Sequence, residues 1–445
     1  MKNNSGIQQA TITKKISDAE MLKTLQCETV AYFLKNADTG TGLIADNSME
    51  GSPCSISVVG MAFNVFIVAA EKKYISRGDA AARILKAMDF LYHAPQGSQK
   101  DATGYKGFYY HFLDMKTGKR AWNSELSTID TAFFIAGALS AAAYFTKKNK
   151  EENSIRDLAD KLYKRVEWDW ATNRKNTITH GWKPGRGFLK YRWDEAYSEA
   201  MILYILALGS PTHPVKSKGY QEWIATFKLT EIYGIQYLYA GPLFIHQFSH
   251  LWIDFRGIED RFNNKVGFDY FENSVRATKV HQQYAIKNPH GFNMYGKDCW
   301  GLTACDGPGN QTLKIDGKKI NFFGYKARGA PFGPDDGTVS PWAVVSSIPF
   351  LPRVVMKTIR MVINKLDLKE KKLSGLDASF NPTYPDKTKN PNGWVSPCKF
   401  GLNQAAIVMM IENYQGGINW KLMKQSNYII VGLKAAGFTG GWLEK

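Results

Sequence analysis

The sequence is poor in cysteine and lacks the spacings that organise disulfide-rich or zinc-binding proteins. Its 445 residues include five cysteines, Cys27, Cys54, Cys299, Cys305 and Cys398, and no two of them form a CxxC pair. An odd number without such spacing excludes a disulfide framework and a zinc site as organising features. Cys299 and Cys305 flank a glycine-rich turn and are the one candidate pair for a disulfide.

The motifs of several functional classes are missing as well. No phosphate-binding loop, dinucleotide fingerprint or GxSxG elbow occurs. Lysine and arginine total 57 against 40 acidic residues, a formal net charge of +17, but the basic residues are scattered, so we expect no nucleic-acid partner. The longest apolar stretch, residues 58–70, is too short to cross a bilayer, and the first thirty residues of this sequence show no signal-peptide pattern.

Aromatic residues, by contrast, are abundant. They make up 13% of the chain and include 12 tryptophans. Aromatic rings stack on the apolar faces of sugar rings, while neighbouring polar groups bind the hydroxyls. A large core with additional tryptophan is the alternative interpretation, and the position of the aromatic residues decides between the two.

Helical periodicity dominates the chain and distinguishes two kinds of helix. Nearly all-apolar segments alternate with amphipathic ones, which indicates an inner layer covered on all sides and an outer layer facing water. Together they predict an all-α fold, an (α/α)6 barrel or toroid over residues 18–445 after a tail of residues 1–17; a helical bundle or solenoid is the alternative. The predicted helices cover residues 18–35, 55–73, 77–93, 127–145, 151–170, 194–208, 241–252, 268–285, 340–350, 352–366 and 402–412.

Three segments rich in glycine and aromatic residues precede apolar helices. They cover residues 104–122, 180–193 and 288–308, and in the first one aromatic residues alternate around a turn at residues 115–118, which predicts a β-hairpin. Long loops in a compact domain usually carry function. Their shared position predicts a cleft lined with aromatic side chains.

One group of acids stands directly before an apolar run. Acid-catalysed cleavage of a glycosidic bond needs two carboxyl groups, one protonated and one ionised. Glu195 and Glu199 are four residues apart in the predicted helix 194–208, which places them on one helix face. Glu199 leads into the apolar residues 200–208, so burial should raise its pKa, as a general acid requires. The helix dipole explains Asp194 and Glu195, but not Glu199, which lies more than one turn inside the predicted helix.

A second group of acids surrounds the start of the predicted helix 127–145. Ser127 and Asp130 have the spacing of a capping box, so a structural role alone would explain Asp130. Glu125 precedes the helix and can point either way. Both remain candidates for the second catalytic carboxyl group.

His246 and His250 have a spacing that can bind a metal ion. The glutamate of an HExxH motif is missing from HQFSH, and no further ligand set is evident. The sequence therefore favours a buried hydrogen-bond network or a polar substrate wall over a metal site.

Long stretches of the chain resemble a known family. These are SELSTIDTAFFIAGAL (124–139), WDEAYSEAMILYILALGSPTHP (193–214), FIHQFSHLWIDFRGI (244–258), DCWGLTACDGP (298–308) and IENYQGGINWKL (411–422). They are similar to the glucoamylase-like family of bacterial (α/α)6-barrel proteins, which includes the β-1,2-glucanases of glycoside hydrolase family 144. The resemblance extends over residues 19–443.

The resemblance implies a glycosidase that hydrolyses a β-glucan, β-1,2-glucan or sophoro-oligosaccharides, by an inverting mechanism without a metal or other cofactor. It places the essential acid on Glu199 and Asp130 in the same pocket, with Glu125 as the alternative second carboxyl group. It also implies export to the periplasm or cell surface, and we expect a monomer whose partner is an oligo- or polysaccharide. The candidate substrate-binding residues are Trp122, Tyr191, Trp193, Asp194, His250, Trp252, Asp254, Arg256, Trp300, Asp306 and Glu412.

Three other functions remain open at this point. The first is hydrolysis of another glucan. The second is a polysaccharide lyase on the same toroid, whose acidic substrates would suit the net charge of +17. The third is a glycan-binding protein without catalysis.

Overall fold

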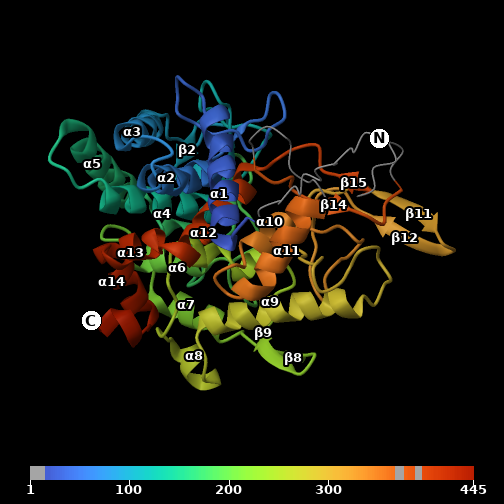
Figure 1. Cartoon of the computed structure of the whole chain (residues 1–445). Helices are drawn as coiled ribbons and strands as arrows, with labels where there is room; N and C mark the ends of the chain where they lie inside the picture. The colour runs from blue at the N-terminus through green and yellow to red at the C-terminus, as the bar shows by residue number, and fades with distance from the viewer. Residues whose placement is uncertain (1–15, 366–374, 386–392, 445) are drawn as a thin grey trace, which may run out of the picture.

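Helices are the predominant regular structure of the molecule, as the hydrophobic periodicity predicts (Figure 1). The computed structural model describes residues 16–365, 375–385 and 393–444. The predicted tail therefore lies almost wholly outside the described residues. The α-helices are α1 (Asp18–Lys35), α2 (Ile56–Glu71), α3 (Arg77–His93), α4 (Thr128–Tyr144), α5 (Lys150–Arg165), α6 (Met201–Leu208), α7 (Ser217–Ile224), α8 (Arg261–Val266), α9 (Tyr270–Lys287), α10 (Pro341–Val345), α11 (Pro352–Lys365), α12 (Gly401–Gln415), α13 (Ile418–Lys424) and α14 (Asn427–Ala436).

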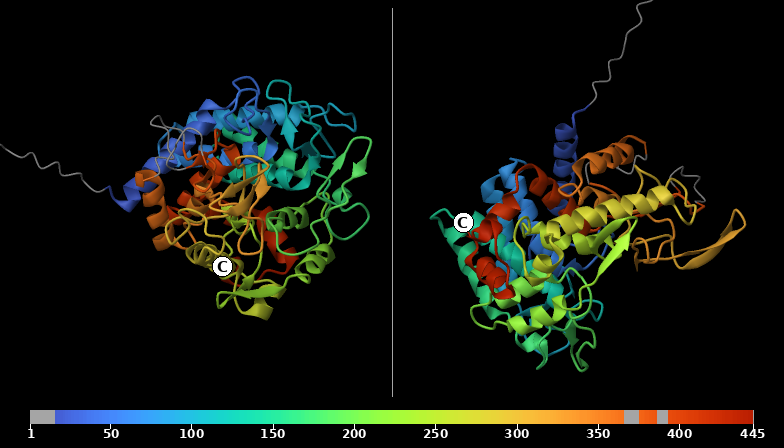
Figure 2. Two further views of the ribbon diagram at one scale, coloured as in Figure 1. Left: turned by 90° about the vertical axis from the view of Figure 1, so that its right-hand side faces the viewer. Right: turned by 90° about the horizontal axis from the view of Figure 1, so that it is seen from below.

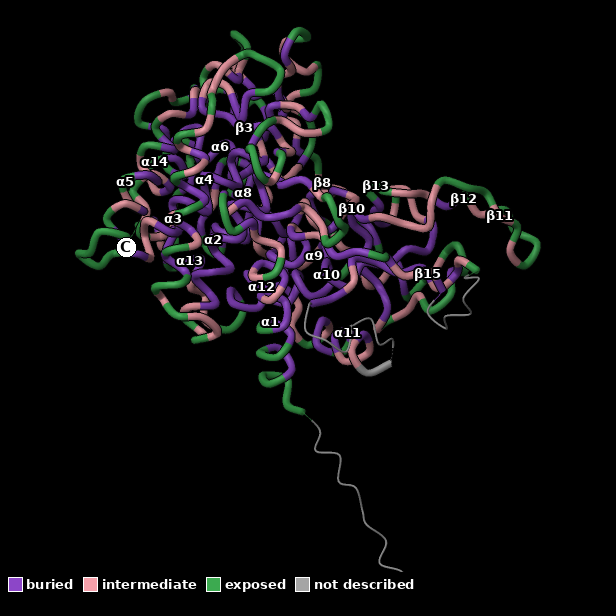
Figure 3. Tube along the Cα trace, turned by 90° about the horizontal axis from the view of Figure 1, so that it is seen from above, coloured by how far each residue is buried: buried purple, intermediate pink, exposed green. Residues whose placement is uncertain are grey.

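Short strands and 3-10 helices fill the connections. The strands are β1 (Cys54–Ser55), β2 (Gly104–Tyr105), β3 (Phe108–Tyr110), β4 (Phe112–Leu113), β5 (Leu126–Ser127), β6 (Gly181–Lys183), β7 (Gly187–Phe188), β8 (Leu229–Ile232), β9 (Ile235–Leu238), β10 (Ala304–Cys305), β11 (Gln311–Ile315), β12 (Lys318–Phe322), β13 (Lys326–Ala327), β14 (Phe380–Asn381) and β15 (Trp394–Val395). The 3-10 helices are η1 (Trp170–Thr172), η2 (Leu243–His246), η3 (Phe248–Leu251) and η4 (Gly441–Glu444). One sheet has five strands in the order β2-β3-β5-β6-β7, and the others are pairs. The β11–β12 hairpin projects from the body and is largely exposed (Figure 3).

The helices form two layers that match the two kinds predicted. The inner helices contact one another in the order α6, α4, α2, α12, α10, and their side chains are almost all buried. An outer helix lies against each of them: α14 on α6, α5 on α4, α3 on α2, α1 on α12 and α11 on α10. Successive parts of the chain follow one another around the molecule, from blue at the top through green and yellow to orange (Figure 2, left). The all-apolar segments are apolar because both of their sides are covered.

Most predicted helices are confirmed, and α1 and α3 begin and end at the predicted residues. Ser17 and Ser76 each accept a hydrogen bond from a backbone N–H in the first turn, which fixes these starts. The predicted helix 340–350 is shorter, because α10 ends at Val345.

Two helices differ from their predictions, one in helix type and the other in length. Residues 241–252 form η2 and η3 rather than one α-helix. Residues 194–200 are irregular, and α6 begins only at Met201. Ala196 has a φ of +54°, in the left-handed region, so a helix cannot run through it. Glu195 and Glu199 therefore do not share a helix face.

The predicted hairpin at residues 104–122 is more complex than expected. Its tight turn is at Lys106 and Gly107, between β2 and β3, and β3 then pairs with β5. The predicted turn at residues 115–118 is also present: Leu113 and Arg120 form an antiparallel bridge across it, and Asp114 accepts hydrogen bonds from the N–H groups of Lys116 and Thr117. The segment thus leads directly to the start of α4.

All five cysteines are free thiols, so the candidate Cys299–Cys305 disulfide is not formed. Within the described ranges, no helix is long and apolar enough to span a bilayer.

Candidate active site

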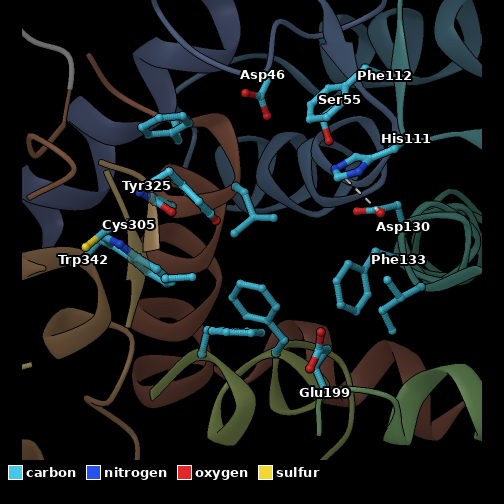
Figure 4. A pocket seen from close by; sticks show the side chains of 17 residues that line it. Asp46, Ser55, His111, Phe112, Asp130, Phe133, Glu199, Cys305, Tyr325 and Trp342 are labelled. Atoms are coloured by element: carbon cyan, nitrogen blue, oxygen red, sulfur yellow. Dashed lines mark ion pairs between the residues drawn. The ribbon is translucent and has the colours of Figure 1, made fainter. Parts of the chain in front are cut away.

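A pocket of about 510 Å³ opens where the N-terminal ends of the inner helices converge (Figure 4). The starts of α4, α10 and α12, and the residues just before α2 and α6, contribute to its wall. Its volume is typical of a small-molecule site. The pocket is lined by Asp46, Ser55, His111, Phe112, Ile129, Asp130, Phe133, Glu199, Phe244, Phe248, Ala304, Cys305, Tyr325, Trp342, Phe400, Leu402 and Asn403.

Asp130 lies in the first turn of α4 and faces the pocket. The predicted cap is confirmed: the Asp130 N–H donates to the Ser127 hydroxyl at 3.2 Å, and that hydroxyl donates to the Asp130 carboxylate at 2.5 Å. The cap fixes the direction of the side chain but occupies only one carboxylate oxygen. Asp130 therefore has a structural role and a free oxygen at the pocket.

Glu199 lies in the turn that precedes α6, on the opposite side of the pocket from Asp46 (Figure 4). Its backbone carbonyl accepts a hydrogen bond from the Ser249 hydroxyl at 3.0 Å, and the same hydroxyl accepts from the Ile202 N–H. These bonds tie the turn to η3. Burial raises the pKa of the Glu199 carboxyl to about 7, with a smaller contribution from the charge of Asp130.

The apolar run that follows Glu199 predicts that its side chain is partly buried, and the structure confirms this. The prediction that Glu199 lies more than one turn inside a helix is wrong, because α6 starts two residues later.

His111 bridges the two other candidate carboxylates. Its Nδ1 lies 3.0 Å from a Glu125 carboxylate oxygen, and its Nε2 lies 3.7 Å from an Asp130 carboxylate oxygen. Burial would lower the pKa of His111, but the charges of Asp130 and Glu125 outweigh it and raise that pKa to about 9. His111 is therefore an imidazolium at neutral pH.

This imidazolium also determines the charge of Glu125. Burial would raise the pKa of Glu125, but the hydrogen bond and the charge of His111 hold it at about 2. Glu125 does not line the pocket itself and lies behind His111. Asp46, half-buried at the pocket wall, has a pKa raised by burial.

The atoms of His111, Glu125 and Asp130 that could bind a cation lie within 4.8 Å of one another. Both ring nitrogens of His111 are engaged by carboxylates, and a protonated imidazole has no lone pair to donate. The three side chains therefore form an ion-pair network with one another.

Aromatic rings form much of the remaining wall. The Phe112 ring stacks on the His111 imidazole with 3.9 Å between ring centroids. Tyr325, on the segment between β12 and β13, is 69% exposed and reaches over the pocket. Phe133 and Trp342 complete the surface from α4 and α10. A flat, weakly polar ligand fits such a surface.

Several predicted substrate-binding residues lie in the core instead. Trp252 is fully buried and donates to Asn64, and Trp300 is buried and donates to Thr358. His250 is buried, with Nε2 3.0 Å from the Ser274 hydroxyl. This agrees with the buried network that the HQFSH motif favours.

The predicted charged residues downstream also have structural partners. Asp254 forms ion pairs with Arg256 and Lys424, at 2.7 and 2.6 Å. Glu412 is buried at the end of α12 and pairs with Lys72. These contacts explain the charges without a ligand, and none of the three predicted residues lines the pocket.

Other predicted residues surround the pocket without lining it. Trp193 is buried, stacks on His180 and donates to the Thr128 hydroxyl, so it supports the start of α4. Asp306 accepts hydrogen bonds from Ser379 and Ser396, and burial raises its pKa.

Three further candidates lie at the surface. Asp194 lies in a separate open groove beside Glu195, and Tyr191 is 61% exposed. Trp122 is also exposed, in a groove next to the pocket.

Three residues that line the pocket, His111, Asp46 and Tyr325, are not among the residues predicted from the sequence. His111 is a lone histidine in the aromatic segment 104–122, and that segment was the only signal for it. Asp46 stands in a loop without any recognisable pattern. Its carbonyl accepts the Gly401 N–H at 2.7 Å, so it reaches the pocket through a contact with the start of α12, more than 350 residues away.

The protein is a two-layered helical protein whose pocket, at the N-terminal ends of the inner helices, is lined by carboxylates and aromatic rings. A family model described as "Putative glucoamylase" matches residues 190–427, more than half of the chain. The chain belongs to this family.

Individual relatives agree with that assignment. The solved structure of a "putative glucoamylase" from Bacteroides uniformis is 30% identical, with a TM-score of 0.84 over 96% of this chain and 99% of that one. An endo-β-1,2-glucanase from Chitinophaga pinensis is 26% identical, with a TM-score of 0.83 over 96% of this chain and 100% of that one. An exo β-1,2-glucooligosaccharide sophorohydrolase of Parabacteroides distasonis is 29% identical, and the match covers 94% of this chain but 58% of that protein. The chain thus spans a little more than half the length of this last relative.

Proposed function

We propose that this chain is a glycoside hydrolase that cleaves β-1,2-glucan or its oligosaccharides by inverting acid–base hydrolysis. The observation that carries the proposal is the pair Glu199 and Asp130, two carboxyl groups of different environment at one aromatic pocket. The activities named for the relatives from Chitinophaga pinensis and Parabacteroides distasonis support the β-1,2 linkage. We further propose that the two helical layers close into an (α/α)6 toroid around this pocket, and that the chain acts as an exported monomer.

In the proposed reaction Glu199 is the general acid. Its pKa of about 7 leaves a large protonated fraction at neutral pH, so the carboxyl can donate a proton to the leaving glycosidic oxygen as the C–O bond breaks. Asp130 is the proposed base: its carboxylate takes a proton from a water molecule whose oxygen attacks the anomeric carbon from the opposite face. The reducing sugar then leaves with the proton of Glu199, and the two carboxyl groups exchange protons through solvent.

The acid–base assignment is tested by a matched pair of variants. Glu199→Gln keeps the size of the side chain but removes the proton donor, so activity on linear β-1,2-glucan should fall by at least about 10³-fold, measured as reducing ends. Glu195→Gln, an exposed acid four residues earlier, should retain wild-type activity. Full activity of Glu199→Gln would contradict the assignment of the acid.

The substrate class is tested by comparing linear β-1,2-glucan, laminarin, starch and a uronate polymer. Reducing ends from β-1,2-glucan alone support the proposal. Reducing ends from laminarin or starch alone would assign another glucan. Products that absorb as unsaturated sugars would indicate a lyase, and binding without products would indicate a glycan-binding protein.

A further inference from the structure

Trp122 combines a largely exposed aromatic side chain with a left-handed backbone conformation. Its side chain is 64% exposed, and its backbone φ is +54°. The next residue, Asn123, also has a positive φ, of +51°. A bulky side chain is costly in the left-handed region, and such strain concentrates at ligand-binding positions.

The surrounding contacts hold this tryptophan against the back of the pocket wall. The Ala121 N–H donates to the Phe112 carbonyl at 2.9 Å, and the Trp122 ring lies 4.9 Å from the Phe112 ring. Phe112 in turn stacks on His111, which lines the pocket. Three rings therefore connect the exposed Trp122 face with the site that holds Asp130.

Trp122 lies in a second groove, of about 580 Å³, that adjoins the pocket. The boundary between the two is a single stretch of chain: Asp46 lines the pocket, while its neighbours Ala45 and Asn47 line the groove. We call this second space the Trp122 groove. Its other lining residues are Lys35, Asn36, Ala37, Asp38, Met49, Gly51, Ser52, Pro53, Asp114, Met115, Lys116 and Ala121.

Three of the four charged side chains that line the Trp122 groove, all except Lys35, are engaged by partners within the protein, which suits a neutral ligand. Lys116 is paired with Asp38 across the groove, and the Asp114 carboxylate accepts from the Thr117 hydroxyl. Asn36, Asn47 and Ser52 add amide and hydroxyl groups beside the exposed ring. An aromatic face next to amides and hydroxyls is the chemistry that binds a sugar ring.

We propose that the Trp122 groove binds glucose units of a glucan chain that extends beyond the catalytic pocket, with Trp122 as the stacking surface. This inference rests on the proposed function, because it takes the pocket to hold the bond that is cleaved. It makes the enzyme's efficiency depend on chain length: a long chain reaches Trp122, whereas a short one fits within the pocket.

The test compares kcat/KM on long β-1,2-glucan with kcat/KM on the β-1,2-linked trisaccharide. Losing a sugar–aromatic stack worth about 1 kcal/mol weakens binding by roughly 5-fold. Trp122→Ala should therefore lower kcat/KM on the polymer about 5- to 10-fold. Its kcat/KM on the trisaccharide should stay within about twofold of the wild-type value. Trp122→Phe should keep most of the polymer activity. Tyr414→Ala removes another exposed aromatic ring, at the far end of α12, and should change neither value. An equal loss on both substrates, or no loss on either, overturns the proposal.

Affinity electrophoresis separates this inference from the catalytic one. Native gels that contain β-1,2-glucan, laminarin or starch report binding whether or not the wild type cleaves the polymer. Retardation of the wild type that is lost in Trp122→Ala supports the groove even if no hydrolysis is found, which would overturn the proposed function alone. Equal retardation of both proteins, or no retardation of the wild type in any gel, overturns the groove.

Discussion

The Nδ1 atom of His111 lies 3.0 Å from a carboxylate oxygen of Glu125, and its Nε2 atom lies 3.7 Å from a carboxylate oxygen of Asp130. One imidazolium thus contacts two carboxylates and offsets part of the repulsion between them near the pocket. Further charged or titratable groups near this cluster are Asp46, His180, Lys183, Glu199 and Tyr325. The protonation of His111 therefore affects both the stability of the protein and the charge of the site.

We expect His111→Gln to destabilise the protein at neutral pH and to have much less effect at high pH. The pKa of His111 is raised to about 9 in the folded state, above its ordinary value near 6.5. The stability that this shift contributes is fully present below about pH 6.5 and is lost as the pH rises through 9. The difference in Tm between wild type and His111→Gln should therefore shrink between pH 6.5 and pH 10, measured by thermal unfolding.

His93→Gln, which removes an exposed histidine beside Asp89, is the control and should show no such trend. A difference that stays constant across this range would show that His111 acts by packing alone.

We expect Glu199→Gln to stabilise the protein at pH 8 while it abolishes activity. The pKa of Glu199 is about 7 in the folded state against an ordinary value of about 4.5, so the contribution of this carboxyl to stability is greatest below pH 4.5 and is lost as the pH rises through 7. Removing the charge should raise the free energy of unfolding at pH 8 on the order of 2 kcal/mol and have little effect at pH 4.5. Urea unfolding at the two pH values measures this, with Glu195→Gln as the control. A variant that is less stable than wild type at pH 8 would contradict the burial of an ionised group here.

The layered helical fold could be predicted from the sequence because a helix that is buried on all sides consists almost entirely of apolar residues. The apolar run of α2 and the amphipathic periodicity of α3 are both local signals, and both correspond to the observed elements. The start of α6 could not be predicted in the same way. Ala196 adopts a left-handed conformation, which an alanine in the sequence does not predict.

The candidate site was predictable only in part, for a related reason. Glu199 and Asp130 stand next to helix starts, where the sequence pattern is informative. Asp46 and His111 reach the pocket through tertiary contacts between distant segments, which no local pattern encodes. Conversely, Trp252 and Trp300 look like cleft residues because they adjoin polar segments, yet their indole N–H groups donate to buried side chains in the core.

We expect Arg328→Met to be strongly destabilising and to open the pocket wall. Arg328 and Asp336 form a fully buried ion pair with 2.7 Å between Nε and Oδ1, and the Arg328 guanidinium also donates to the Cys305 carbonyl in the wall. Removing one partner leaves a buried charge unpaired, which costs about 3–5 kcal/mol. Lys119→Met breaks the exposed pair with Asp101 and should cost less than about 1 kcal/mol. Urea denaturation of both variants measures the contrast, and equal small losses would show that the buried pair contributes no more than the exposed one.

The contact between α2 and α4 should be intolerant of a single added methyl group. A Cβ atom at Gly137 would lie 1.9 Å from the Gly60 carbonyl oxygen, a backbone atom that cannot move aside without shifting the helix. Gly137→Ala should therefore lower the free energy of unfolding by about 3 kcal/mol or prevent folding, although alanine favours the helix by about 1 kcal/mol. Gly78→Ala in α3 is the matched control, because its new Cβ would meet only the Ser76 hydroxyl at 3.8 Å. This control should be neutral or gain about 0.5–1 kcal/mol, as judged by thermal unfolding. Because α2 and α4 both begin at the pocket, a Gly137→Ala protein that folds should also lose activity in proportion to the displacement of Asp130. A folded variant with wild-type stability and activity would show that the two helices do not pack as closely as their glycines require.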